Sequence, residues 1–317
     1  ESEASVLDEV VVTGMGAQKK LTVTGAVTNV NVGDLKRFPT SNMSNALAGN
    51  VPGIIARQTS GQPGKSTSEF WIRGISTFGA SSSAYILVDG FERSSLDELN
   101  IEDIESFTVL KDASATAIYG SKGANGVVLV TTKRGLESKL KISGRANMTI
   151  SHLKRLPEYV NATQYAEMAN EASVATGLSP IYNKTEMDII KYGLDPDLYP
   201  NIDWQDVILN PNSFQQTYYV SAQGGSSVAR YFASLGMSKE SAAYNPSKDS
   251  KYNKGVGYDT YNYRLNLDID LTKTTKVYIG TTGYMSVNTR PSMGEYSRGV
   301  SLTDWLWSSQ AKTTPIS

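Results

Sequence analysis

Cysteine is absent from the 317 residues, histidine occurs once, and no run of about 18 apolar residues is present. Without cysteine, these residues contain neither disulfides nor thiolate metal sites. The single histidine, His152, is accompanied by no Gly-x-Ser-x-Gly nucleophile elbow, so a Ser-His-Asp hydrolase is not expected. The missing apolar run excludes a transmembrane helix, but it does not exclude a membrane barrel, whose alternating strands escape a hydropathy search.

The sequence also lacks an excess of either charge, with 30 Lys and Arg against 31 Asp and Glu. This balance argues against a nucleic-acid partner bound by bulk electrostatics. The sequence shows no nucleophile–base pair and no cluster of metal ligands, so we expect no enzyme, no cofactor and no metal site. No signal peptide precedes the polar start at Glu1, which we interpret as a mature or trimmed product.

Residues 100–135 read as a strand–helix–strand unit. Phe107–Leu110 is the first strand, and Asp112 is placed to N-cap a helix over Ala113–Tyr119. The continuous apolar run Val127–Val130 is typical of a strand buried on both faces. The glycines between helix and strand differ from a phosphate-binding loop because they follow a helix instead of opening one.

The unit belongs to a mixed α/β domain over residues 21–135. A short helix capped by Ser41 or Asn42 is expected to end near Gly49. Loops rich in Gly, Ser and Thr, residues 59–68 and 76–83, are either surface connections or ligand-contacting tips. The remaining expected strands are Ala26–Val32, Val51–Arg57, Phe70–Arg73 and Ala84–Val88.

From residue 136 the hydrophobic period changes to two. Apolar and polar residues alternate along Leu140–Ile150 and, most cleanly, along Thr260–Leu271. Three further segments, residues 217–223, 230–239 and 276–287, follow the same pattern, with Tyr219 as an aromatic exception on a polar face. We therefore expect five antiparallel strands. Asp268 and Asp270 share a fully polar face, which favours solvated lumen residues over a metal site or an acid/base pair.

The connections distinguish a membrane barrel from a soluble sandwich. Tight turns at residues 224–227 and 272–275 alternate with long connections at residues 151–214 and 241–259. Short turns at one rim and long loops at the other are typical of outer-membrane barrels. Tyrosines near several strand ends fit an interfacial girdle. The sequence therefore predicts a mixed α/β domain followed by strands of a transmembrane β-barrel over residues 136–317.

An ordered set of motifs resembles one family, the SusC-like (RagA/SusC) branch of TonB-dependent outer-membrane transporters, which take up nutrients in Bacteroidetes-type bacteria. The motifs are Leu7–Gly14, Asn45–Gly49, Ile72–Gly74, Leu87–Gly90, Asp103–Glu105, Leu110–Ala113, Tyr119–Gly120 and Gly123–Val127. The resemblance implies that residues 21–135 are a plug domain inside a barrel of about 22 strands. Because five strands leave open edges that cannot persist in lipid, we expect a larger complete protein.

Residues 1–20 are interpreted as a TonB box and linker. A β-prone segment near the terminus either is a buried strand of the next domain or adds a strand to a partner's sheet. The resemblance favours the second alternative and implies that TonB binds this segment. Its residues are Leu7, Asp8, Glu9, Val10, Val11, Val12 and Thr13.

The resemblance also implies TonB-dependent active import of an oligosaccharide or peptide across the bacterial outer membrane. Expected partners are TonB with its inner-membrane motor proteins, a SusD-like surface lipoprotein as a lid, and outer-membrane lipid. Plug and TonB box would be accessible from the periplasm. The alternative is a receptor for signalling, or for a siderophore or cobalamin. Implied cargo contacts at the plug apex are Phe78, Ser81, Ser82, Ser83, Phe91 and Arg93.

Overall fold

The computed structural model describes residues 10–13, 16–19, 27–37, 42–58, 60–72, 74, 83–154, 156–245, 256–289, 308–310 and 312–316. The chain divides into two units. The first comprises residues 1–149, 215–240 and 258–287, which hold the domain predicted to be a plug and the body of the long strands. The second comprises residues 150–214, 241–257 and 288–317, which hold the long connections.

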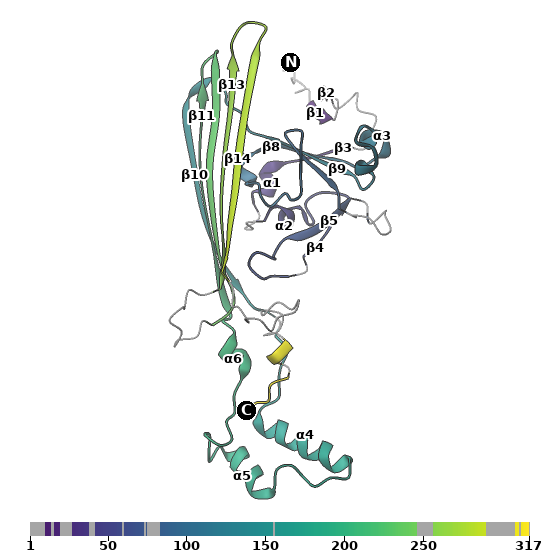
Figure 1. The fold of residues 1–317 in the computed structure, drawn as a ribbon, viewed down its shortest axis with the longest axis vertical. Coiled ribbons are helices and arrows are strands. Elements are labelled where there is room, and N and C mark those ends of the chain that lie inside the picture. Colours follow the sequence, from purple (N-terminus) through teal and green to yellow (C-terminus); the bar gives the residue numbers. More distant parts are fainter. Residues whose placement is uncertain are drawn as a thin grey trace, which may run out of the picture. The chain divides into compact units, whose positions relative to one another are not determined.

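A five-stranded mixed sheet forms the plug domain, in the order β3-β8-β9-β6-β7. Figure 1 labels three of these strands, β3, β8 and β9. Strands β6 and β9 are parallel, and the other neighbours are antiparallel. A separate antiparallel hairpin joins β4 to β5. The strands expected from the sequence are confirmed, and β7 is additional. Their bounds are β3 (Val27–Val30), β4 (Ile54–Gln58), β5 (Ser68–Ile72), β6 (Tyr85–Val88), β7 (Phe91–Arg93), β8 (Ile104–Leu110) and β9 (Val127–Thr132).

Strand β9 is buried on both faces, as its continuous apolar run predicts. Val128 and Val130 belong to the cluster that includes α1 (Val32–Leu35) and α2 (Met43–Leu47). Val127 and Leu129 belong to the opposite cluster, with residues from α3 (Ala113–Thr116) and the 3-10 helix η3 (Ala117–Gly123). Each fully buried aliphatic side chain stabilises the fold by about 1.5–3 kcal/mol. The plug sheet therefore carries a hydrophobic core on each of its two faces.

Two turns of the plug domain depend on left-handed backbone. Asp89 and Gly90, with φ of 51° and 87°, form the two-residue turn that joins β6 to β7. Positive φ at both positions is what a tight hairpin of this kind requires, and Asp-Gly is a preferred pair. Gly120, with φ of 58°, interrupts the helical segment that starts at Ala113. Asp112 occupies the N-cap position there, but its side chain makes no capping hydrogen bond.

Five long strands form a second sheet, in the order β10-β11-β12-β13-β14, and lie side by side in Figure 1. We call this sheet the wall. Residues of the apolar set, such as Leu235 and Leu265, are exposed, whereas several members of the polar set are buried against the plug domain. The five expected strands are confirmed. Their bounds are β10 (Ser138–His152), β11 (Asn212–Gly225), β12 (Ala229–Ser241), β13 (Gly257–Asp270) and β14 (Lys276–Thr289).

Both tight turns of the wall are closed by backbone hydrogen bonds, Ser226 N to Ala229 O at 2.8 Å and Thr272 N to Thr275 O at 3.2 Å. In the second unit, α4 (Ala162–Ala175) and α5 (Lys184–Tyr192) each begin with a capping box, and α6 (Trp204–Ile208) follows. Ala162, Ala166 and Ile190 form the buried centre of this unit. No helix among the described residues is long and apolar enough to span a membrane.

Candidate functional site between the plug domain and the wall

The first contact between plug domain and wall is a buried hydrogen bond. A 3-10 turn, η2 (Ile101–Asp103), places Asp103 at the start of β8. Tyr219 of β11 donates its hydroxyl to Asp103 Oδ1 at 2.7 Å. The Asp103 side chain is only 6% exposed, and burial raises its pKa above the ordinary value. The contact explains why an aromatic residue interrupts the polar face of β11.

Arg264 of β13 lies between two carboxylates of the plug domain. Its Nη1 is 3.2 Å from Asp89 Oδ2, and its Nε is 3.8 Å from Asp103 Oδ2, which is an ion-pair distance too long for a hydrogen bond. The Arg264 side chain is 5% exposed. Asp89 also accepts hydrogen bonds from the backbone N–H and hydroxyl of Thr132. A single wall residue therefore ties the β6–β7 turn and the start of β8 to the same point.

The polar face of β13 continues this attachment, which corrects one expectation. Asp268 is buried and pairs with Arg134 at 3.2 Å, and Asn266 Nδ2 donates to Lys133 O at 2.7 Å. Asp270 is less buried and pairs with Arg230 at 2.9 Å. The prediction of a solvated residue is wrong for Asp268, because alternation reports which face of a strand is polar and not what covers it; Asp270 is partly exposed. The prediction that they form no metal site is untouched by this correction.

A second arginine, Arg145 of β10, holds three partners. Its Nη1 is 2.6 Å from Glu102 Oε1, its Nη2 donates to Lys36 O at 2.9 Å, and its Nε donates to Asn147 Oδ1 at 3.2 Å. Lys36 Nζ also pairs with Glu102 at 2.8 Å. Burial of Glu102 opposes ionisation, but the hydrogen bonds from Lys36 and Arg145 outweigh it and hold its pKa below the usual value. We call this group, Lys36, Glu102 and Arg145, the latch.

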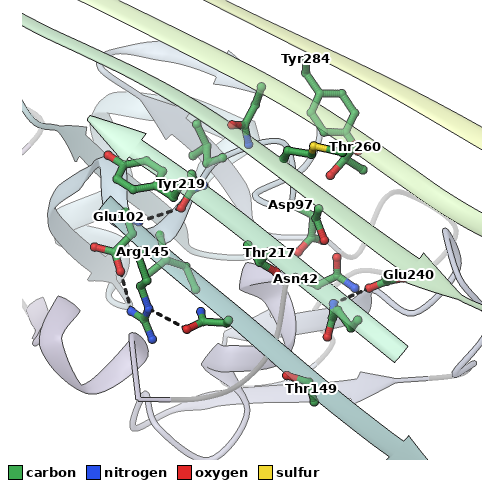
Figure 2. Close-up of a pocket in the computed structure, with 18 of the residues that line it drawn as sticks. Asn42, Asp97, Glu102, Arg145, Thr149, Thr217, Tyr219, Glu240, Thr260 and Tyr284 are labelled. Carbon is green, nitrogen blue, oxygen red and sulfur yellow. Dashed lines mark hydrogen bonds and ion pairs between the residues drawn. The ribbon is translucent and has the colours of Figure 1, made fainter. Parts of the chain in front are cut away.

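A polar pocket of about 80 Å³ opens beside the latch. Figure 2 shows Arg145 reaching toward Glu102, with Tyr219, Asp97 and Tyr284 around the same space. Its charged groups are already engaged, since Glu240 bonds the amide of Gln215 and Asp97 accepts from Ser44 N. Amides, hydroxyls and tyrosine rings therefore supply most of its contact chemistry. Ser238 Oγ lines the pocket, is buried, and has no hydrogen-bond partner among the described residues.

The residues predicted to bind TonB are partly described. Leu7, Asp8 and Glu9 lie outside the described residues. Residues Val10–Thr13 form strand β1, which pairs antiparallel with β2 (Gly16–Lys19). The extended backbone is the conformation that strand addition requires, and the role of this segment remains a prediction.

The predicted plug-apex residues are not brought together among the described residues. Phe78, Ser81 and Ser82 lie outside that part of the chain, and Ser83 is an exposed residue just before β6. Phe91 and Arg93 lie on β7 instead of on a turn, and Phe91 is exposed. Arg93 lines a small hollow with Glu98 and Tyr284. Cargo contact by this set is therefore still a prediction.

Sequence reasoning missed the residues that join the two sheets. Tyr219 carried a signal, an aromatic residue on a polar strand face. Arg264 carried a weaker one, as a cation among Asn and Asp on β13. Glu102 and Lys36 carried no signal, because their shared partner Arg145 is far away in the sequence. It lies 43 residues from Glu102 and 109 residues from Lys36.

Comparison with known proteins identifies the two sheets. Residues 19–127 match the family described as TonB-dependent Receptor Plug Domain. The chain is 34% identical over 278 residues to a TonB-dependent receptor of Formosa agariphila, an alignment covering 86% of this chain and 26% of that protein. It is 30% identical over 269 residues to the TonB-dependent receptor SusC of Bacteroides thetaiotaomicron, covering 81% and 25%.

Among solved structures, the RagAB peptide importer in its "open-open" state aligns with a TM-score of 0.73 and 26% identity, covering 94% of this chain and 34% of that one. The chain thus spans about a quarter of the length of its curated relatives. The α/β domain coincides with the family's plug, and the wall corresponds to part of a plugged barrel. The chain belongs to the SusC-like TonB-dependent receptors, of which it carries the plug domain and a partial barrel.

Proposed function

We propose that the whole protein imports a nutrient, an oligosaccharide or a peptide, across the bacterial outer membrane with energy delivered by TonB and its inner-membrane motor proteins. The observation that carries this proposal is the way in which the plug meets the wall. Their interface includes buried polar contacts of Asp103 and Arg264 and the partly exposed ion pairs of Glu102. Polar contacts can be exchanged for water when a plug moves, whereas an apolar core would resist it.

The location of the pocket supports cargo binding. It is lined by the plug on one side and by residues of all five wall strands on the other, among them the halves of β10 and β11 that lead into the long connections. Amides, hydroxyls and tyrosines suit a ligand rich in hydroxyl or peptide groups. We propose Phe78, Ser81, Ser82, Ser83, Phe91 and Arg93 as additional cargo contacts on the plug.

The proposal includes a SusD-like lipoprotein that closes the barrel from the cell surface, in keeping with the similarity to SusC and to the RagAB importer. In this arrangement the plug and β1 face the periplasm, where TonB reaches them. Strand β1 would add a strand to TonB through main-chain hydrogen bonds.

A membrane location predicts different costs on the two faces of the wall. Leu265→Arg places a charge on the exposed apolar face of β13 and should destabilise the barrel by about 2–4 kcal/mol near the bilayer midplane. Ser286→Arg adds the same side chain to the opposite face of β14 and should be nearly neutral. Heat-modifiable mobility of the folded barrel in gels measures both. Equal effects of the two substitutions would contradict the lipid-facing assignment.

Growth and uptake test the proposed activity. Cells from which the gene is deleted should lose growth on one oligosaccharide or peptide source from a panel, and should stop accumulating the labelled nutrient. A receptor that signals, or that binds a siderophore or cobalamin, gives a different result. In that case nutrient uptake is unchanged, and the deletion instead alters a transcriptional response or growth on scarce iron or cobalamin.

A further inference from the structure

A second pocket follows the first along β10 and β11, two of the wall strands that line the first pocket. It measures about 480 Å³ and is lined by residues that include Glu105, Lys133, Lys141, Ser143 and Gln223. Glu102 and Tyr219 line both pockets. The two spaces are therefore neighbours, separated by Glu102 of the plug and Tyr219 of the wall.

The register of the wall shows that the two pockets form a continuous track. On β10, inward residues Thr149, Asn147 and Arg145 line the first pocket, and the next inward residues, Ser143 and Lys141, line the second. Strand β11 repeats the order, with Gln215 and Thr217 in the first pocket and Ser221 and Gln223 in the second. Inward residues lie two apart along a strand, so none is skipped between the pockets. The track runs from the long connections toward the tight turns.

We propose that cargo crosses between the plug and the β10–β11 part of the wall, and that the latch together with the Asp103–Tyr219 contact is the gate on this route. This inference rests on the proposed import. Two carboxylates of η2 close the track. Glu102 is held by Arg145 and Lys36, and Asp103 is held by Tyr219. Moving one short turn of the plug would join the two pockets.

Lys36 connects this gate to the N-terminal segment, on which TonB is proposed to pull. Among the described residues, strand β3 is the edge strand of the plug sheet and pairs with β8 over four residues. Helix α1 follows β3 directly, and Lys36 is its C-cap. Drawing β3 and α1 away removes both the Lys36 carbonyl from Arg145 and the Lys36 ammonium from Glu102. The gate then loses half of its ion pairs without unfolding of the plug core.

Blocking the second pocket tests the route in the full-length receptor. Ser143 is exposed on the inward face of β10, so a larger side chain has room without disturbing the fold. Ser143→Trp, and more completely Lys141→Trp/Ser143→Trp, should reduce nutrient uptake to the level of cells lacking the receptor, while cargo affinity and receptor abundance stay unchanged. Ser286→Trp, the same change at an inward residue of β14 that lines neither pocket, should import normally. Wild-type uptake in the double variant would overturn the route.

Leakage tests the gate without depending on cargo or TonB. Arg145→Gln should let a bulky hydrophilic antibiotic enter cells that lack TonB, and adding Ser143→Trp should close this leak again. No leak in Arg145→Gln overturns the gate, and a leak that Ser143→Trp leaves open overturns the route. If the wild-type receptor shows no TonB-dependent uptake, the proposed import itself is wrong, whatever the leak measurements give.

Discussion

Val11→Pro should abolish nutrient uptake while leaving receptor abundance, lid pairing and cargo affinity intact. Proline removes the amide donor of Val11 and fixes φ, so a strand added to TonB loses a ladder hydrogen bond at its centre. Conservative changes such as Val11→Ile should have little effect, because main-chain hydrogen bonds supply most of the affinity in strand addition. Binding of the full-length receptor to the C-terminal domain of TonB, measured beside uptake, provides the readout.

The hairpin offers a matched control for this variant. Val11 pairs with Gln18 of β2. Gln18→Pro therefore disrupts the same hairpin from its other strand without touching residues 7–13, and it should leave uptake in place. If Gln18→Pro abolishes uptake as fully as Val11→Pro, the hairpin and not the β1 strand is what TonB requires. If deletion of residues 7–13 leaves a folded receptor that imports at the normal rate, the segment is only a tether.

Arg264→Leu is expected to lower the free energy of plug opening by roughly 3–5 kcal/mol, because it removes one partner of a buried ion pair. Asp89 and Asp103 would then lie at the wall without the cation that now sits between them. Hydrogen exchange of the β8 and β9 amides in the purified full-length receptor measures this opening. Arg37→Leu is the control, because Arg37 is 81% exposed in its pair with Asp34 and such pairs contribute about 0–1 kcal/mol.

The decrease in the free energy of plug opening caused by Arg264→Leu should depend on pH. Burial raises the pKa of Asp103, so this carboxyl binds its proton more tightly in the folded plug than in the unfolded chain. Its contribution to stability is therefore present at low pH and is lost as the pH rises through the folded-state pKa. The difference between variant and wild type should shrink on acidification. A deficit no larger than that of Arg37→Leu, or one that grows at low pH, would contradict the role given to Arg264.

Local patterns in the sequence were sufficient to predict most of the fold. The continuous apolar run Val127–Val130 predicts a strand buried on both faces, and the alternation in Thr260–Leu271 predicts a strand with one polar face. The structure has strands at both places. Strand β7 was missed although Asp89-Gly90 between two extended segments is a hairpin signal.

The attachment of plug to wall could not be predicted in this way. Arg264 and Asp89 are 175 residues apart, and Tyr219 and Asp103 are 116 apart. Periodicity identifies a polar face but does not say which residues of another domain cover it. The polar face of β13 therefore looked solvated, although Asn266 and Asp268 are buried against Lys133 and Arg134.

The most direct measurement of the central claim is the distribution of labelled nutrient in cells with and without TonB, both carrying the full-length receptor. Binding at the cell surface should be equal in the two strains, because the pocket is formed by plug and wall alone. Accumulation inside should occur only where TonB is present, since release of the plug from Tyr219, Arg264 and Arg145 requires work on the chain. Equal accumulation in the two strains would contradict energy-coupled import by this plug.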